Sequence, residues 1–302
     1  MPAAGRALEV PRLGLAPRTR QLLSDYVELT KPKVQSLLLL TTIATMYVAG
    51  DPSPGLVALT CLGGYLSAGG AGAVNHWFDR DIDVQMKRTA SRPIPSGRVA
   101  PRAALLYGCL LACLSVIELS LTVNPLAAAL SFSGFIGYVF VYTVWLKRRT
   151  PQNIVIGGAA GAVPPLVGWA AVHNTVGGTA VILFFIVFFW TPPHFWALSL
   201  LMKGEYEKVG VPMLPVVRGE AETRRQILLY SVLLYAVTQL PFCAGGFGLI
   251  YLAASLVLGL GFIGGAVRLY RRADRQSALR LYLYSLAYLA VLFCAMVADK
   301  HL

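Results

Sequence analysis

Long apolar stretches separated by shorter polar segments dominate the chain. Nine stretches are each about 20 residues long, which is the length a helix needs to cross the hydrocarbon core of a bilayer. They cover residues 34–50, 56–74, 103–122, 126–145, 153–172, 179–201, 227–244, 247–267 and 279–297. The pattern predicts an all-α integral membrane protein with nine transmembrane helices. We expect residues 1–30 to form a cytoplasmic N-terminal tail and residues 31–302 to form one transmembrane domain.

The composition agrees with lipid as the main solvent, because 56% of the 302 residues are hydrophobic and 13% are charged. A net charge of +12 would suggest nucleic-acid binding in a soluble protein. Here, however, 25 of the 26 Lys and Arg residues lie before the first stretch or within residues 75–102, 146–152, 202–226 and 268–280. Because basic loops stay on the cytoplasmic side, this alternation predicts a multi-pass protein of the cell inner membrane with its N-terminus inside and its C-terminus outside. We expect no nucleic-acid partner.

Candidate metal ligands follow the second apolar stretch. Asn75, Asp79 and Asp83 are four residues apart, so a helix would place them along one face. Carboxylate and amide oxygens suit a hard cation, and Mg²⁺ is commonly held by one or two carboxylates together with substrate phosphate. The other interpretation is a solvated helix end whose acids pair with nearby basic residues. The position beside a basic loop at a membrane boundary favours the metal site.

Basic residues surround this motif. Lys87, Arg88 and Arg92 follow it, and Lys147 and Arg148 come after the fourth stretch. Guanidinium groups bind phosphate oxygens in a bidentate manner, so these side chains are candidate ligands of a diphosphate. Cations at that position would stabilise the charge that builds up as diphosphate leaves.

Two neighbouring stretches contain proline pairs, Pro164-Pro165 and Pro192-Pro193, and we expect both helices to be interrupted there. Backbone freed in this way must face protein or a wet cavity. Together with polar residues on one side of the membrane, this predicts a central cavity that opens to the cytoplasm.

His194 lies inside the sixth stretch, and an ionisable side chain within a membrane segment is a functional candidate. A neutral imidazole could ligate iron, act as a base or serve a structural role, and the sequence does not choose between these. Glu205 could supply a further metal contact or belong to a charge-mixed loop, and Lys203, two residues earlier, is an additional site candidate. Asn153 is a further polar candidate.

The chain resembles the UbiA-type intramembrane prenyltransferase superfamily, and within it the protoheme IX farnesyltransferase (heme O synthase) branch. The resemblance is carried by Tyr26–Pro32, Asn75–Asp83, Arg88–Arg98, Tyr142–Arg148, Asn153–Trp169, Trp190–Trp196 and Gly210–Val217. It implies nine transmembrane helices around a central cavity, with Mg²⁺-bound diphosphate at the cytoplasmic end. One departure is that the second aspartate-rich motif of other members is absent: the segment from His194 to Glu207 contains no aspartate.

The resemblance implies that a farnesyl group passes from farnesyl diphosphate to a vinyl group of protoheme IX (heme b), with water addition, giving heme O and diphosphate. It implies metal-binding roles for Asn75, Asp79 and Asp83, and it makes heme A synthase a candidate partner besides the lipid bilayer. One alternative is a prenyltransferase of the same fold with another aromatic or quinone acceptor. A transporter or a structural subunit of a respiratory complex is an alternative from another class.

Overall fold

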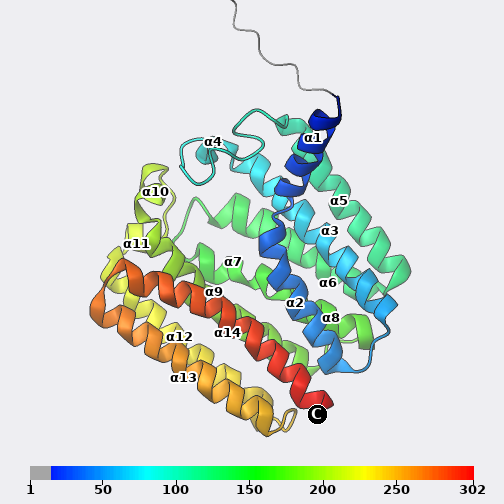
Figure 1. Cartoon of the computed structure of the whole chain (residues 1–302), viewed down its shortest axis with the longest axis vertical. Coiled ribbons are helices and arrows are strands. Elements are labelled where there is room, and N and C mark those ends of the chain that lie inside the picture. The colour runs from blue at the N-terminus through cyan, green and yellow to red at the C-terminus, as the bar shows by residue number, and fades with distance from the viewer. Residues whose placement is uncertain (1–14) are drawn as a thin grey trace, which may run out of the picture.

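The computed structural model describes residues 15–302, and most of this segment is helical (Figure 1). The elements in chain order are α1 (Leu15–Leu29), α2 (Pro32–Ala49), α3 (Pro54–Phe78), α4 (Arg80–Asp83), α5 (Pro101–Thr122), α6 (Pro125–Ile136), the π-helix η1 (Gly137–Leu146), α7 (Asn153–Gly161), α8 (Val163–His173), α9 (Gly178–Leu201), α10 (Lys203–Lys208), α11 (Leu214–Val217), α12 (Gly219–Cys243), α13 (Leu249–Arg272) and α14 (Arg275–His301). The expected all-α fold class is confirmed.

Eight helical segments within residues 15–302 are long and apolar enough to cross a membrane. They are Pro54–Phe78, Pro101–Thr122, Pro125–Leu146, Asn153–His173, Gly178–Leu201, Gly219–Cys243, Leu249–Arg272 and Arg275–His301. The chain is therefore an integral membrane protein. The first expected span coincides with α2, which carries Lys33 and Gln35 in its first turn and is not among the eight. The count of nine spans stays a prediction.

The two proline pairs have different outcomes. The fifth expected span is interrupted, because α7 ends at Gly161 and α8 begins at Val163, just before Pro164. The expected interruption of the sixth span is wrong, because α9 runs through Pro192 and Pro193 without a break. Both of these prolines are buried, and α9 packs against α12 and α14. A proline removes only its own donor, so packing on both sides can hold the helix together.

Small residues bring α3 and α5 into close contact. A β-carbon on Gly70 would lie 2.6 Å from the carbonyl oxygen of Gly108, and one on Gly108 would lie 2.8 Å from that of Gly70. Only glycine fits at this crossing, which is a common way for helices to associate in lipid. The opposite side of α5 exposes Leu106, Leu110 and Leu121, as expected for a lipid-facing surface.

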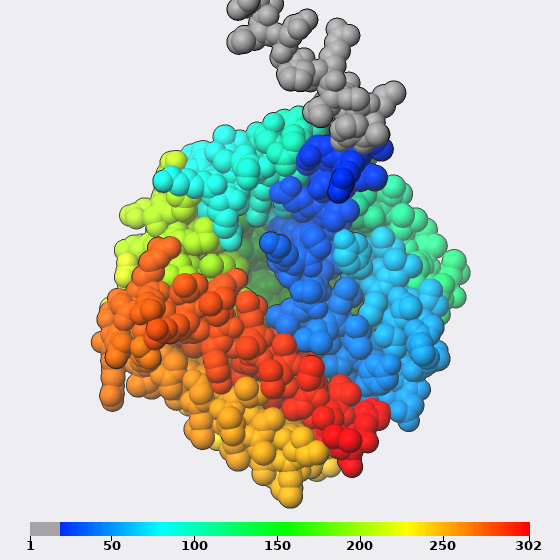
Figure 2. All heavy atoms as spheres, viewed as in Figure 1, coloured from blue at the N-terminus to red at the C-terminus, as the bar shows by residue number. Residues whose placement is uncertain are grey.

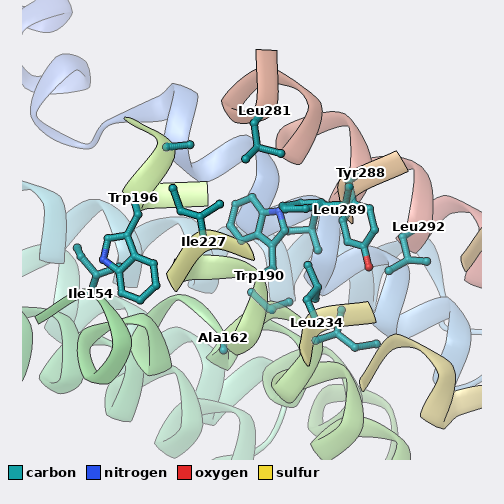
Figure 3. Close-up of a cluster of buried hydrophobic side chains, with 14 of the residues drawn as sticks. Ile154, Ala162, Trp190, Trp196, Ile227, Leu234, Leu281, Tyr288, Leu289 and Leu292 are labelled. Carbon is teal, nitrogen blue, oxygen red and sulfur yellow. The ribbon is translucent and has the colours of Figure 1, made fainter. Parts of the chain in front are cut away.

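The largest apolar core joins α9, α12, α13 and α14. Trp190 and Trp196 of α9 lie in it beside Ile227, Leu281 and further buried side chains (Figure 3). This core fixes α9, which carries His194, against α14.

The basic loops gather at one end of the bundle, and the short turns gather at the other. At the end with the short turns, His301 contacts the carbonyl oxygen of Tyr47 and His173 contacts that of Ala49. At the opposite end, Arg148 bonds Asp81, and Lys208 bonds the carbonyl oxygen of Gln85. A hollow in the molecular surface is bordered by α2, α14, and the segments around α4 and α10 (Figure 2).

Candidate active site

The acidic motif keeps the spacing expected from the sequence. α3 ends at Phe78 and α4 begins at Arg80, yet Asp79 N–H donates to the carbonyl of Asn75 and Asp83 N–H donates to that of Asp79, both at 2.9 Å. The four-residue register therefore continues through the junction. The side chains of Asn75, Asp79 and Asp83 are all buried. Nδ2 of Asn75 donates to Oδ2 of Asp79 at 2.7 Å, so the first two members of the motif are in direct contact.

Three of the five predicted diphosphate ligands lie on these acids. Lys147 forms an ion pair with Asp79, and Arg92 forms one with Asp83 at 2.7 Å. Arg148 reaches Asp79 at 3.4 Å and also donates to both carboxylate oxygens of Asp81 at 2.7 Å. These hydrogen bonds from Arg148 lower the pKa of Asp81. Buried carboxylates and basic side chains thus form one charge-balanced cluster.

The π-helix η1 supplies the side of this cluster opposite α3. Within it, Thr143 Oγ1 donates to the carbonyl of Tyr138, and Lys147 N–H donates to that of Tyr142. The wider turn orients Thr143 to accept a hydrogen bond from Asn75 Nδ2 at 3.1 Å. Single π-helical turns often mark functional sites. Nothing in the amino-acid pattern indicates this π-helix, because π and α segments in a membrane share the same apolar composition.

Lys31 is the site residue that sequence reasoning missed, although the segment Tyr26–Pro32 carried part of the resemblance. Its Nζ donates to Asn75 Oδ1 at 2.5 Å and to Tyr138 Oη at 3.3 Å. Lys31 adopts the left-handed conformation, with φ 56°, just before Pro32. Such strain in a non-glycine residue is typical of functional sites. Burial, together with the nearby charges of Arg92 and Lys147, lowers the pKa of Lys31 to about 7.

Lys87 and Arg88 lie farther out, in an exposed turn. Residues 84–99 form turns rather than a helix, so Arg88 and Arg92 do not share a helix face. Arg88 is instead close enough to Tyr206 to oppose the rise in the pKa of that phenol, which burial causes. The structure therefore brings Arg92 to the acids and leaves Lys87 and Arg88 at the rim.

The segment around α10 closes over this turn. Glu205 Oε2 accepts a hydrogen bond from the backbone N–H of Lys87 at 2.7 Å, and Lys208 bonds the carbonyl oxygen of Gln85. Glu205 thus contacts the 84–99 loop rather than Asp79 or Asp83. Lys203 pairs with Glu220 at 3.2 Å, away from the acidic motif. We refer to the contacts of Glu205 and Lys208 with the 84–99 loop as the clasp.

Two buried polar side chains lie beside the cluster. Asn153 donates to the carbonyl oxygen of Lys147 at 3.2 Å and so supports the residue that pairs with Asp79. Oδ1 of Asn153 has no partner among the described residues. His76, adjacent to Asn75, is buried, and neither of its ring nitrogens has a partner among residues 15–302. Both residues keep unused polar atoms near the charged cluster.

His194 lies on α9 and faces α14 rather than the acidic motif. Its Nδ1 is 2.6 Å from Oγ of Ser285, and its ring stacks between those of Trp190 and Tyr282. No contact between His194 and the acids is observed within the described residues, so it belongs to a second polar location in the bundle.

An apolar cavity of about 190 Å³ adjoins Lys31 and Tyr138. Its walls come from α2, α3, α6, α7 and α8, and they include Leu38, Ala71 and Phe135. The cavity thus has one charged end, and its other walls are mostly apolar, with Thr42, Ser67 and Ser131 as polar exceptions. That combination suits a ligand with an anionic head and a hydrocarbon chain.

The donor set at the acidic motif fits Mg²⁺. Asn75, Asp79 and Asp83 offer hard oxygen ligands. Each of these side chains accepts a hydrogen bond from one basic residue: Asn75 from Lys31, Asp79 from Lys147, and Asp83 from Arg92. No group of three His, Cys, Asp or Glu residues able to hold a metal occurs within residues 15–302. A metal here therefore depends on the Asn75 amide and on ligands brought by the substrate.

Comparison with known proteins places these residues in a family context. A profile of the UbiA prenyltransferase family matches residues 38–293. A Chloroflexus aurantiacus protein named protoheme IX farnesyltransferase is 55% identical over 94% of this chain and 49% of its own length. A Symbiobacterium thermophilum protein of the same name is 53% identical over 92% of this chain and 95% of its own length. The chain spans about half the length of several such relatives, at 49%, 53% and 57%.

Solved structures share the fold at low sequence identity. A structure described for digeranylgeranylglyceryl phosphate synthase in membranes has a TM-score of 0.75 at 20% identity, covering 93% of this chain and 99% of that one. A UbiA homolog from Archaeoglobus fulgidus bound to DMAPP and Mg²⁺ has a TM-score of 0.65 at 17% identity, covering 90% of this chain and 99% of that one. These likenesses show the all-helical fold.

Proposed function

The chain belongs to the UbiA prenyltransferase family, and on this basis we propose that it transfers a farnesyl group from farnesyl diphosphate to a vinyl group of protoheme IX. Addition of water then gives heme O, and diphosphate is released. Relatives named protoheme IX farnesyltransferase support the choice of donor and acceptor.

One observation carries the proposal: a buried Asn75–Asp79–Asp83 face meets Lys31, Arg92 and Lys147 beside an apolar cavity. A purely structural helix bundle gains little from burying so many charges, because desolvation offsets much of their attraction. A site for an ionised diphosphate with a hydrocarbon tail needs both the cluster of charges and the apolar cavity. The clustering of these charges at one end of the bundle also argues against a transporter, which would need a polar path to the other end.

We assign the diphosphate to the cations of this cluster. Asn75, Asp79 and Asp83 would hold Mg²⁺, which neutralises charge on the leaving diphosphate when bound. Lys147, Arg148 and Arg92 now satisfy the carboxylates, and Lys31 satisfies the Asn75 amide oxygen. These same basic side chains would donate to the phosphate oxygens of a diphosphate bound beside the acids. Lys87 and Arg88 extend the positive rim outward.

We assign the farnesyl chain to the apolar cavity. Lys31 and Tyr138 lie at its charged end, so a chain lying along Leu38 and Phe135 would keep its diphosphate on the basic cluster. Apolar walls exclude water from the allylic centre until the acceptor is in place.

The placement in the membrane follows from the basic loops. We propose an inner-membrane, multi-pass domain over residues 31–302 with the acidic motif on the cytoplasmic side, α2 as a ninth span, and the C-terminus outside. Heme A synthase is the proposed recipient of the product.

A product assay tests the function. Purified full-length chain receives protoheme IX, farnesyl diphosphate and Mg²⁺, with EDTA added in a parallel sample, and the hemes are separated by mass. A metal-dependent product heavier by one farnesyl group plus water is the expected result. Absence of that product, while a protein already shown to make heme O is active in the same assay, would move the assignment to another aromatic acceptor.

A further inference from the structure

His194 is held rigidly from both faces of its ring. The ring of Trp190, one turn earlier in α9, lies 4.2 Å away at an interplanar angle of 18°. The ring of Tyr282, from α14, also stacks on His194, with ring centroids 4.9 Å apart and an interplanar angle of 28°. Trp190 is itself fixed, because its Nε1 donates to the carbonyl oxygen of Ser285 at 2.8 Å, and Figure 3 shows it within the core. Stacking covers the ring faces and leaves the edges of the imidazole for polar contacts.

The hydrogen bonds of Ser285 determine which nitrogen of His194 carries the proton. Oγ of Ser285 donates to the carbonyl oxygen of Tyr282 at 2.6 Å, and a carbonyl can only accept. A hydroxyl has a single hydrogen, so the same Oγ must accept in its 2.6 Å contact with His194 Nδ1. Nδ1 therefore carries the hydrogen, and Nε2 of the neutral ring carries a free lone pair.

Nε2 makes no hydrogen bond within residues 15–302, and the His194 side chain is partly exposed. An imidazole with Nδ1–H held by an oxygen and with Nε2 free is the usual arrangement of a metal-binding histidine. No group of three His, Cys, Asp or Glu residues within the described chain could complete a site for a free ion. The fitting metal is one that brings its other ligands with it. The iron of a porphyrin has four nitrogens in its plane and needs one axial ligand from the protein.

Packing also connects this histidine with the diphosphate site. A β-carbon on Gly158 would lie 3.0 Å from Thr191, one turn before His194, and one on Gly157 would lie 2.5 Å from Tyr142. Tyr142 lies beside Tyr138, which bonds Lys31. The α7 glycines thus bring the His194 turn of α9 close to η1, which carries Tyr138 and Tyr142 and ends just before Lys147.

We propose that Nε2 of His194 is the axial ligand of the iron of the porphyrin acceptor, with Ser285 as a positioning residue that fixes the ring and its tautomer. The assignment rests on the proposed function, because it requires a metalloporphyrin substrate. It deepens that function by giving the acceptor a defined anchor on the α9–α14 side of the bundle.

Titration of the full-length protein in detergent with ferric protoheme IX, without farnesyl diphosphate, tests the proposal. Absorption and electron paramagnetic resonance spectra report the iron ligand, and the titration gives Kd. We expect a histidine-ligated spectrum that His194→Ala abolishes, together with a Kd at least about 10-fold weaker, since about 1.4 kcal/mol of coordination corresponds to tenfold. Added imidazole should restore the ligated spectrum in His194→Ala, which a merely structural role would not produce.

The matched control is Asp79→Asn, which should keep the wild-type heme spectrum while losing product formation. If His194→Ala does not fold, Ser285→Ala gives a second reading: the ligated spectrum should become heterogeneous and should recover in Ser285→Thr. An unchanged spectrum and Kd in His194→Ala, with wild-type protein making heme O, would overturn the ligand and leave the proposed function standing. If wild-type protein neither binds protoheme nor makes product, the proposed function itself fails, and the ligand assignment fails with it.

Discussion

Lys31 Nζ donates to Oδ1 of Asn75 at 2.5 Å, although 44 residues separate the two in sequence. The ammonium group is thus bound to the amide oxygen that the proposed metal would use. Lys147 binds Asp79 in the same way, and Arg92 binds Asp83. Lys147 and Arg92 balance the two buried carboxylates, and each of the three basic side chains lies where a phosphate oxygen could accept its hydrogen bonds.

The first prediction concerns the pH dependence of stability. Burial lowers the pKa of Lys31 to about 7 from 10.5. Between these values the unfolded chain binds a proton at Lys31 that the folded chain does not, so this residue makes the free energy of unfolding rise with pH. Below about pH 7 Lys31 is protonated in both the folded and the unfolded chain, so its contribution to the free energy of unfolding no longer changes with pH. Lys31→Met should remove this rise.

The measurement is the thermal midpoint of the metal-free protein in detergent at pH 7, 8 and 9. Other groups titrate in both proteins, so the informative quantity is the wild-type midpoint minus the Lys31→Met midpoint, which should increase across this range. A difference that stays constant or falls would contradict the low pKa of Lys31.

The second prediction concerns Asp79, which is buried between Asn75, Lys147 and Arg148. Asp79→Asn should lower kcat/KM by about 100-fold or more, because a charge that acts in the transition state is removed from a water-poor site. It also leaves Lys147 without its carboxylate, so Asp79→Asn/Lys147→Met separates catalysis from stability by removing both charges. Asp81→Asn is the matched control, since Asp81 is exposed, and it should change kcat/KM by a few-fold at most. Similar losses in both single variants would count against a special role for Asp79.

The third prediction concerns the packing of α7 on η1. Gly157→Ala would place a methyl group 2.5 Å from Cδ2 and 3.0 Å from Cβ of Tyr142, so the aromatic side chain must move. Overpacking of this kind costs about 1–3 kcal/mol, and we expect both a lower thermal midpoint and lower product formation. Gly264→Ala in α13 is the control, because nothing lies within 4 Å of its added carbon. Equal thermal midpoints in the two variants would show that the Tyr142 side chain can move without loss of stability.

The fourth prediction concerns the clasp. Glu205→Ala removes the acceptor for Lys87 N–H, and a net hydrogen-bond contribution of about 1 kcal/mol corresponds to roughly a 5-fold change in equilibrium. We expect KM for farnesyl diphosphate to rise by about that factor with kcat little changed, and limited proteolysis within residues 84–99 to become faster. Glu207→Ala is the control, since Glu207 is exposed and one residue beyond Tyr206. A collapse of kcat alone in Glu205→Ala would instead indicate direct contact with the reacting groups.

The sequence by itself determined the features that depend on local periodicity and composition. The lengths of the apolar stretches gave the membrane helices, with edges within a few residues for spans such as 179–201, observed as Gly178–Leu201. The four-residue spacing gave the common face of Asn75, Asp79 and Asp83, because backbone hydrogen bonds between neighbouring turns carry that register. The helix break before Pro164 could likewise be predicted, because it depends on the proline pair in the same segment.

Only the tertiary structure decided which distant groups meet. Lys31 on Asn75, Lys147 on Asp79 and Ser285 on His194 join residues 44, 68 and 91 positions apart, and those contacts depend on how helices pack rather than on the composition of any one helix. Packing also kept α9 whole through Pro192 and Pro193, and it assigned Glu205 to the backbone of Lys87. Helix formation depends on residues within one or two turns of each other. Each contact in the site depends instead on how two helix surfaces, far apart in the sequence, pack together.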